Sequence, residues 1–155
     1  PFGLGVFAAR NIDSGDVILR FSCPRVDFAY AVALGDDQCY CLQIGAKHYL
    51  NLDAPGRLVN HSCGPNAGII EDDTLVAIRT IERHSEILYD YSTTMEEHCW
   101  TMTCECKTPV CRGIVSDFST LPELTQRRYL SAGIVQEFIR ARYGIAPKWH
   151  RLAGR

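Results

Sequence analysis

Three of the eight cysteines lie within eight residues of one another, at Cys104, Cys106 and Cys111. Thiolates at this spacing can bind one zinc ion, but a tetrahedral structural site needs a fourth ligand. Cys63 is a candidate, because it lies in a short run of turn-forming residues that would hold its side chain rigidly. Other cysteines remain open as alternatives on spacing alone: Cys23, Cys39, Cys41 and Cys99. The clustering predicts a metal site rather than ordinary buried thiols.

The number of cysteines bears on the compartment. Eight among 155 residues are fewer than the roughly 8–10% that marks a disulfide scaffold. Clustering of three of them favours a reducing environment with a metal site over oxidised pairs. We therefore expect an intracellular, reducing compartment (cytoplasm or nucleus), with secretion as an effector into a host cell as the alternative. Cys39 and Cys41 alternate on an expected strand and are interpreted as buried thiols on one face.

Residues 57–66, RLVNHSCGPN, form a second candidate for chemistry. An apolar pair leads into polar and turn-forming residues, and Asn60, His61 and Cys63 lie close together in the sequence. A lone histidine is more often a structural hydrogen-bonding group, but its neighbours here favour a site. The triplet Asn-His-Ser also matches a glycosylation acceptor, an interpretation discarded because no other feature suggests secretion.

Two shorter segments carry weaker signals. Tyr89 and Tyr91 are two residues apart in EILYDY (86–91), so on an extended strand they point to the same side and could line a narrow channel. Half-buried strand tyrosines are the alternative. Gly3-Leu4-Gly5 would let a backbone approach a ligand closely, but no strand–helix unit with a third glycine follows, so it is no dinucleotide motif. Taken alone, this segment is interpreted as a simple turn rather than a site.

From residue 2 to about residue 92 the sequence has the pattern of short strands separated by turns. These strands must position the candidate residues. Strands are expected at 17–21, 40–44, 48–52, 74–78 and 86–89, with a hairpin turn at 45–47. Residues 27–34 fit either a short helix or an irregular insert. The chain is therefore expected to be mainly β, with a helical appendage in its C-terminal part.

The C-terminal part has the pattern of helices. Thr120-Leu-Pro-Glu123 matches a capping box with proline in the first turn, which predicts a helix start. A second helix is expected after Gly133, ending at Gly144. The residues expected to share one face of the first helix are Leu121, Leu124, Tyr129 and Leu130. The expected divisions are a main domain at 1–98, a cysteine segment at 99–115, a helical appendage at 116–145 and a mobile tail at 146–155.

Composition excludes several classes of protein. The formal net charge of −2 argues against a general or sequence-specific nucleic-acid binder, which is usually basic. No apolar run reaches the roughly 20 residues that span a bilayer, so we expect no membrane segment. No signal peptide is visible, and the chain starts at Pro1 without an initiating methionine, which suggests trimming or processing.

Taken together and in this order, four segments resemble the SET family of protein lysine methyltransferases. Gly3-Leu4-Gly5 resembles its G-x-G turn, and residues 57–66 its R-[FI]-[IV]-N-H-S-C-x-P-N motif. Residues 86–91 resemble its E-L-x-[FY]-D-Y motif, and residues 104–113 its post-SET pattern C-x-C-x4-C-x-G. The resemblance covers about residues 2–115, and the helical tail is similar to that of small stand-alone SET proteins. Leu4 replaces a frequent aromatic residue, and the insert at 21–39 lacks a frequent Gly-Glu pair, so substrate recognition is less defined.

The resemblance implies an α+β fold of small β-sheets, the SET β-clip, with a knot-like crossing that brings residues 60–61 and 91 together. It implies that zinc holds the post-SET segment and that helices follow it. Zinc would be bound by Cys63, Cys104, Cys106 and Cys111. S-adenosylmethionine would be bound by Gly3, Leu4, Gly5, Arg57, Asn60 and His61.

The resemblance also implies the reaction, which is methyl transfer from S-adenosylmethionine to a lysine nitrogen. Tyr91 lies at the position of the family's catalytic tyrosine. Tyr89 falls where the family sets the number of methyl groups, which favours monomethylation over dimethylation. The expected partner is a protein or peptide with a target lysine, a histone being one candidate, and homodimerisation is open. Alternatives are an inactive SET-like interaction module and a zinc-binding β domain without cofactor. Small-molecule and DNA methyltransferases are disfavoured because they usually have a nucleotide-binding α/β fold.

Overall fold

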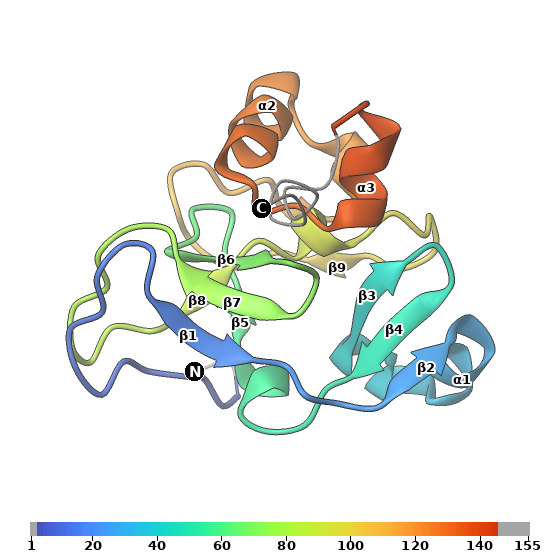
Figure 1. The fold of residues 1–155 in the computed structure, drawn as a ribbon, viewed down its shortest axis with the longest axis horizontal. Helices are drawn as coiled ribbons and strands as arrows, with labels where there is room; N and C mark the ends of the chain where they lie inside the picture. The colour runs from blue at the N-terminus through green and yellow to red at the C-terminus, as the bar shows by residue number, and fades with distance from the viewer. Residues whose placement is uncertain (1–2, 146–155) are drawn as a thin grey trace, which may run out of the picture.

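The computed structural model describes residues 3–145, in which short strands form four small sheets, one short helix lies between two of the strands and two helices follow at the end (Figure 1). The strands are β1 (Val17–Arg20), β2 (Arg25–Asp27), β3 (Cys41–Gly45), β4 (His48–Asn51), β5 (Asn60–His61), β6 (Ala67–Ile70), β7 (Thr74–Ala77), β8 (Leu88–Tyr89), β9 (Met102–Thr103) and β10 (Ile114–Val115). The α-helices are α1 (Phe28–Ala33), α2 (Glu123–Ala132) and α3 (Glu137–Arg142). The 3-10 turns are η1 (Gly35–Tyr40), η2 (Gly56–Leu58), η3 (Tyr91–Thr94) and η4 (Phe118–Thr120).

Two three-stranded antiparallel sheets enclose the main core. Their strand orders are β1-β7-β6 and β2-β4-β3. β3 and β4 form the expected hairpin, with Leu42 paired to Leu50. Residues 27–34, which the sequence left undecided, contain a helix because the Asp27 side chain caps α1 by accepting a hydrogen bond from the Tyr30 amide at 2.8 Å. The expectation of a mainly β chain is confirmed.

A parallel pair, β5 and β8, joins two segments far apart in the sequence. Asn60 pairs with Leu88 and His61 with Tyr89. The side chain of Asn66 holds this crossing in place. Its Nδ2 donates to the Glu86 carbonyl and its Oδ1 accepts from the backbone N–H of Leu88, both at 2.8 Å. The crossing brings residues 60–61 next to residue 91, as the resemblance implied.

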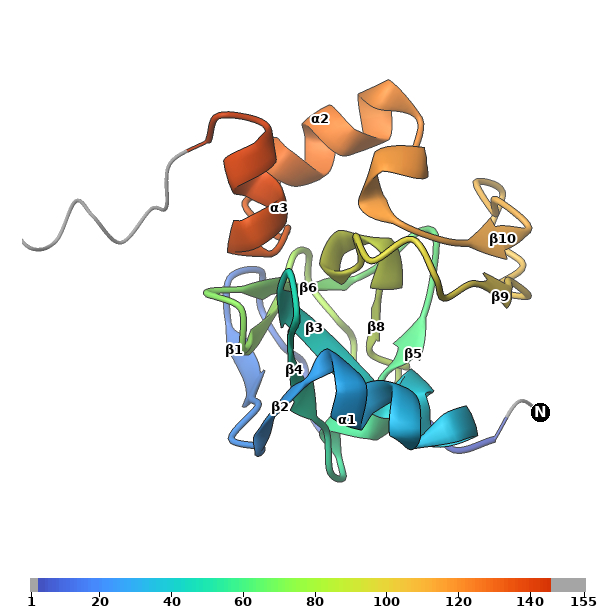
Figure 2. The ribbon, with the colours of Figure 1, turned by 90° about the vertical axis from the view of Figure 1, so that its right-hand side faces the viewer.

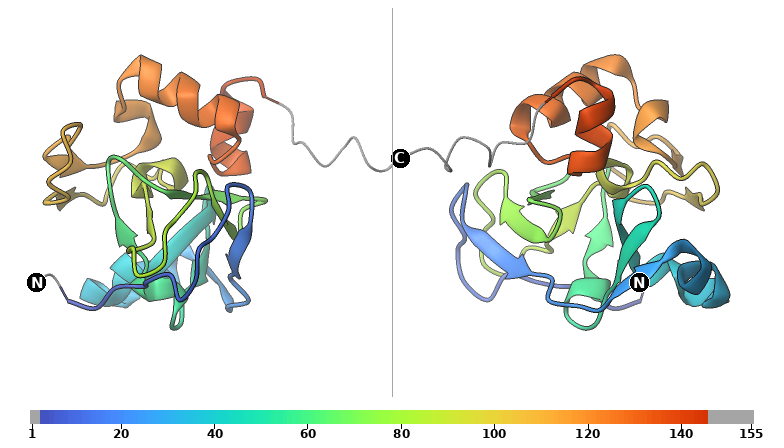
Figure 3. Two further views of the ribbon diagram at one scale, coloured as in Figure 1. Left: turned by 90° about the vertical axis from the view of Figure 1, so that its left-hand side faces the viewer. Right: turned by 45° about the vertical axis from the view of Figure 1, so that its right-hand side comes forward.

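The C-terminal helices pack on one side of the sheets and enclose a second core (Figure 2 and Figure 3). The predicted capping box is wrong, because Thr120 ends η4 and its hydroxyl donates to the Asp117 carbonyl at 2.7 Å. α2 instead begins after Pro122, without a side-chain cap. Leu124 is also not on the buried face, since 81% of it is exposed. Gly133 ends α2 in the left-handed region (φ 73°), as expected.

The second helix begins later than the sequence predicted, at Glu137 rather than near Ile134. Ile134 and Val135 are buried in the second core as part of the connection between α2 and α3. The predicted mobile tail, 146–155, lies outside the described residues. Among residues 3–145, no helix has the length and apolarity needed to cross a bilayer.

Gly68 in β6 packs against Ile134 in the connection between α2 and α3. A Cβ at this position would lie 2.6 Å from Cγ2 of Ile134. We expect Gly68→Ala to lower the free energy of unfolding by about 1–3 kcal/mol, because backbone or side chain must shift in a packed core. Chemical denaturation measures this, with Gly64→Ala as control, since a Cβ there would meet its nearest atom at an ordinary 3.5 Å. Equal stability of the two variants would contradict the predicted packing.

Candidate functional site

Tyr91 lies at the junction of two cavities. One is a narrow channel of about 40 Å³, lined by aromatic and apolar side chains that include Tyr89, Leu42 and Trp100. The other is an open cleft of about 550 Å³ whose lining includes Asn60. Tyr91 lines both, and no other described residue does. A ligand in the cleft and a side chain in the channel could therefore meet at this ring.

The Tyr91 hydroxyl is held in one orientation. It donates to the carbonyl of Val59 at 2.8 Å, and burial raises the pKa of the phenol, so it stays protonated at neutral pH. With its proton directed to Val59, the oxygen can only accept hydrogen bonds from a group at the junction. The Tyr89 ring centroid lies 4.8 Å from that of Tyr91, as expected, although only Tyr89 is in a strand.

The N-terminal glycines lie beside two residues that line the cleft, Asn60 and Glu86. The Asn60 amide donates to the Leu4 carbonyl at 3.1 Å and to Oε1 of Glu86 at 2.8 Å. Gly3 has φ 63°, a conformation that favours glycine, and a Cβ on Gly5 would lie 2.5 Å from Glu86 Oε1. The structure thus brings Leu4 and Gly5 next to Asn60 and Glu86, which line the cleft.

Arg57, predicted to act at the cofactor, lies elsewhere. It is in η2, lines the channel rather than the cleft, and its guanidinium carbon is 5.3 Å from the centroid of the Tyr40 ring. The family resemblance, rather than a pattern in the residues, assigned it to the cofactor together with Asn60. The chain turns between them, however, and the two side chains face different cavities.

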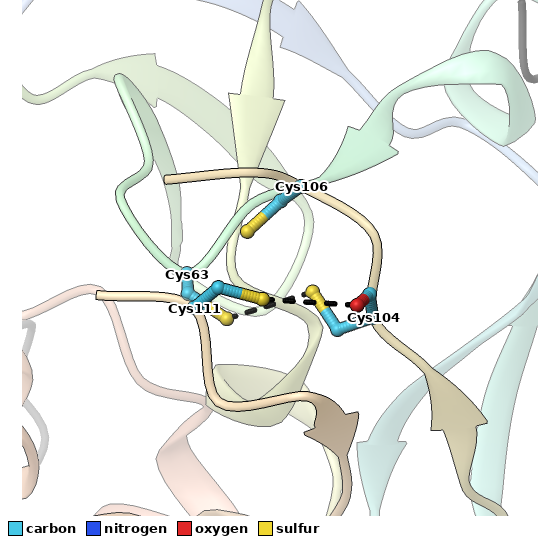
Figure 4. Close-up of side chains that lie close together, drawn as sticks. All are labelled: Cys63, Cys104, Cys106 and Cys111. Atoms are coloured by element: carbon cyan, nitrogen blue, oxygen red, sulfur yellow. Dashed lines mark hydrogen bonds between the residues drawn. The ribbon is translucent and has the colours of Figure 1, made fainter. Parts of the chain in front are cut away.

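The four predicted cysteines converge. Sulfur atoms of Cys63, Cys104, Cys106 and Cys111 all lie within 4.8 Å of one another, and Figure 4 shows them pointing to a common centre. Tetrahedral zinc with Zn–S bonds of about 2.3 Å separates sulfurs by about 3.8 Å, and Cys63 and Cys104 are 3.7 Å apart. Cys63, not the other four candidates, therefore completes the set among the described residues.

The electrostatics of this cluster fit a cation. Burial raises the pKa values of Cys63 and Cys104, since an apolar setting disfavours thiolates. For Cys106, burial acts in the same direction, but hydrogen bonds from Thr108 and the neighbouring cysteines lower its pKa to about 6. Four thiols this close can ionise together only around a positive ion. The donor set, its spacing and its burial therefore fit zinc.

His61 connects the cluster to Tyr91. Its Nδ1 accepts from the Tyr91 amide at 3.2 Å, so Nε2 carries the proton and lies 3.4 Å from the sulfur of Cys63. Burial lowers the pKa of His61 to about 4, despite the nearby carboxylate of Asp90, so the ring is neutral. A neutral histidine in this tautomer orients a thiolate rather than binding a proton.

The sequence analysis missed a buried network around Asp90. Its carboxylate pairs with Arg112, which directly follows Cys111, and accepts a hydrogen bond from Tyr129 of α2. It also missed Glu97, which accepts a hydrogen bond from the Tyr49 hydroxyl at the channel. Asp90 stands inside the EILYDY segment, but no local pattern reveals which distant side chains pair with it.

Comparison with known proteins settles the family, since residues 3–92 match the SET domain. The chain belongs to the SET-domain family. Histone-lysine N-methyltransferase ash1 of Drosophila melanogaster is 32% identical over 129 residues, which cover 73% of this chain and 6% of that protein. Human histone-lysine N-methyltransferase 2B is 28% identical over 129 residues, covering 71% and 5%. The H3 lysine-4 specific enzyme of Schizosaccharomyces pombe is 29% identical over 130 residues, covering 73% and 14%.

The chain thus spans 14% or less of the length of these three SET-domain relatives, and the similarity concerns one part of larger proteins. Among solved structures, a humanized mutant of the Chaetomium thermophilum Polycomb Repressive Complex 2 bound to the inhibitor GSK126 aligns with a TM-score of 0.50. It is 18% identical, and the match covers 58% of this chain and 13% of that chain. This likeness supports the SET fold alone.

Proposed function

We propose that this chain is a protein-lysine N-methyltransferase that uses S-adenosylmethionine. The observation that carries the proposal is the placement of Tyr91 between a narrow channel and a wide cleft. A lysine side chain is long and unbranched, so it suits the channel, and a cleft of about 550 Å³ is within the range of small-molecule sites. The similarity to named histone-lysine methyltransferases supports the same reaction.

The cleft has the features that a bound S-adenosylmethionine would need. Asn60 and His61 present polar groups to the cleft, and the exposed Gly3 and Leu4 lie beside it. When bound, this molecule supplies an electrophilic methyl group on a positively charged sulfur. Asn60, already tied to Leu4 and Glu86, would fix the wall against which it binds.

The channel prepares the lysine amine for reaction. A free lysine has a pKa near ~10.4 and is mostly protonated at neutral pH. The channel has room for only a few water molecules, so desolvation favours the neutral amine, whose lone pair is the nucleophile. Tyr91 is too weak an acid to serve as a phenolate base, since burial raises its pKa. Its oxygen instead orients the amine, and alignment contributes several kcal/mol to such reactions.

Labelled methyl transfer tests the proposal directly. The chain is incubated with labelled S-adenosylmethionine and a panel of histones and cell extract, and labelled lysines are mapped by mass spectrometry. Calorimetric titration with S-adenosylmethionine accompanies the assay. Binding without transfer to any protein would indicate an inactive SET-like module. Absence of binding would indicate a zinc-binding β domain.

Because a metal–thiolate cluster needs reduced cysteines, we also propose a reducing compartment.

Tyr89 is proposed to limit the number of methyl groups. Its ring is buried and lines the channel, and its hydroxyl has no hydrogen-bond partner among the residues that the structure describes. That hydroxyl can bind the amine or a water and occupies space that a further methyl group needs. We expect Tyr89→Phe to shift the products from monomethyl-lysine to dimethyl- and trimethyl-lysine, measured by mass spectrometry of the modified peptide.

Tyr40→Phe is the matched control, because this tyrosine also lines the channel but faces Arg57. Its product distribution should equal that of the unaltered chain. A Tyr89→Phe product spectrum that also equals it would show that Tyr89 does not limit methylation.

A further inference from the structure

Asp90 is a fully buried carboxylate between the two channel tyrosines. It accepts two hydrogen bonds from the guanidinium of Arg112, at 2.7 and 2.8 Å, and one from the hydroxyl of Tyr129 at 3.0 Å. The Ser92 amide donates to the same carboxylate at 3.1 Å. Three parts of the chain therefore meet at one side chain: the tyrosine segment, the cysteine segment and α2.

Arg112 touches the cysteine cluster as well. Its backbone N–H donates to the sulfur of Cys63 at 3.4 Å, and it follows Cys111 directly. One residue thus contacts a proposed zinc ligand with its main chain and the carboxylate beside Tyr91 with its side chain. A bidentate guanidinium–carboxylate pair fixes orientation as well as distance, because both groups are planar.

Stability alone is a poor reason for this ion pair. Well-packed apolar groups in place of a buried pair are often as stable or more so, because both charges lose their hydration. What a charged fork provides is a defined geometry. The segment that carries it has little other structure, since β9 and β10 share only two residue pairs. Such a segment needs a rigid connection if it is to influence the site.

We propose that Arg112 is a positioning residue that couples zinc binding to the placement of Tyr91 through Asp90. With zinc bound, the cysteine segment is fixed and Arg112 holds Asp90. Asp90 in turn holds the η3 turn, because its side chain and carbonyl accept hydrogen bonds from the amides of Ser92 and Thr93. The catalytic consequence rests on the proposed function, whereas the coupling is a property of the folded chain. Linkage requires that weakening this pair also weakens zinc binding.

Zinc affinity tests the coupling without cofactor or substrate. Competition with a chromophoric chelator is measured for the unaltered chain, Arg112→Lys and Tyr129→Phe. Arg112→Lys keeps the charge but loses the fork, and we expect about tenfold weaker zinc binding or more, as for other groups that orient metal ligands. Tyr129→Phe removes a contact that α2 makes to the same carboxylate. The unfolding midpoint of this variant should therefore fall, while its zinc affinity should not. Zinc affinity within twofold of the unaltered chain for Arg112→Lys would overturn the proposal.

Amide hydrogen exchange in the unaltered chain gives a second test that requires no variant to fold. The Tyr91 and Ser92 amides are hydrogen-bonded to His61 and Asp90. We expect their protection to fall when zinc is removed, and to be low in Arg112→Lys even with zinc bound. Protection that is unchanged by zinc removal would contradict the coupling.

Activity separates this inference from the proposed function. For Arg112→Lys we expect kcat to fall about tenfold or more while KM for the peptide changes little, because the channel is intact and the alignment is lost. A merely structural Arg112 would lower the unfolding midpoint without changing zinc affinity or kcat. If the unaltered chain transfers no methyl group, the proposed function fails, while zinc affinity and exchange still decide the coupling.

Discussion

Replacing Tyr91 by phenylalanine is expected to lower kcat for methyl transfer by at least about a hundredfold, the usual effect of removing one preorganised polar group at a reacting centre. The substitution leaves the ring between channel and cleft but removes the oxygen that accepts a hydrogen bond there. Affinity for S-adenosylmethionine should stay within about threefold, because the other residues of the cleft are unchanged. Initial rates at saturating cofactor, together with calorimetric titration, measure both quantities.

Folding has to be controlled in this experiment. The Tyr91 hydroxyl is the hydrogen-bond donor to the buried Val59 carbonyl, so its loss costs about 1–3 kcal/mol of stability. Rates are therefore compared below the unfolding midpoint of the variant, with Tyr40→Phe as a tyrosine of the same channel that does not line the cleft. A Tyr91→Phe enzyme with more than about a tenth of the original kcat would refute the assignment.

Sequence patterns correctly predicted the secondary-structure elements that depend on neighbouring residues alone. The hairpin of β3 and β4 follows from alternating apolar residues around a short polar turn, and Gly133 ends α2 because glycine adopts the left-handed conformation easily. The cysteine segment was visible from spacing. Cys63, separated from it by 41 residues, was one candidate among five on sequence alone and was selected by the family resemblance, and the crossing of β5 and β8 explains why it lies there.

Sequence patterns were a poor guide where contacts between distant parts of the chain override them. Thr120 has a partner three residues before it in a 3-10 turn, so it does not cap the helix that its sequence suggested. Arg57, which the resemblance assigned to the cofactor, lines the channel rather than the cleft, and its role at the cofactor stays a prediction. The pairing of Asp90 with Arg112 and Tyr129 joins residues 22 and 39 positions away, and no spacing rule connects them.

Removing zinc is expected to abolish methyl transfer and to lower the free energy of unfolding by at least about 3 kcal/mol, or about 6–12 °C in midpoint for a domain of this size. The cysteine segment has little else to hold it, because a two-stranded ladder is marginal in water. Its buried apolar residues, Cys104 and Val115, belong to a small cluster that also contains Cys63 and Met95. The same segment forms one wall of the cleft through Met102 and Cys106, so its release opens the cofactor site.

Dialysis against a chelator, followed by thermal unfolding and the methyl-transfer assay, measures both effects. Added zinc should restore the unfolding midpoint and the activity. Elemental analysis should find one zinc per chain in the purified protein. Cys63→Ser should lose the metal and reproduce the chelated state. Cys23→Ser should keep it, because Cys23 instead makes a hydrogen bond to Asp53 and is not one of the four converging thiols. If chelation leaves midpoint and activity unchanged, the four thiols do not hold a structural metal, and the cleft wall must be stabilised by packing around Val115 alone.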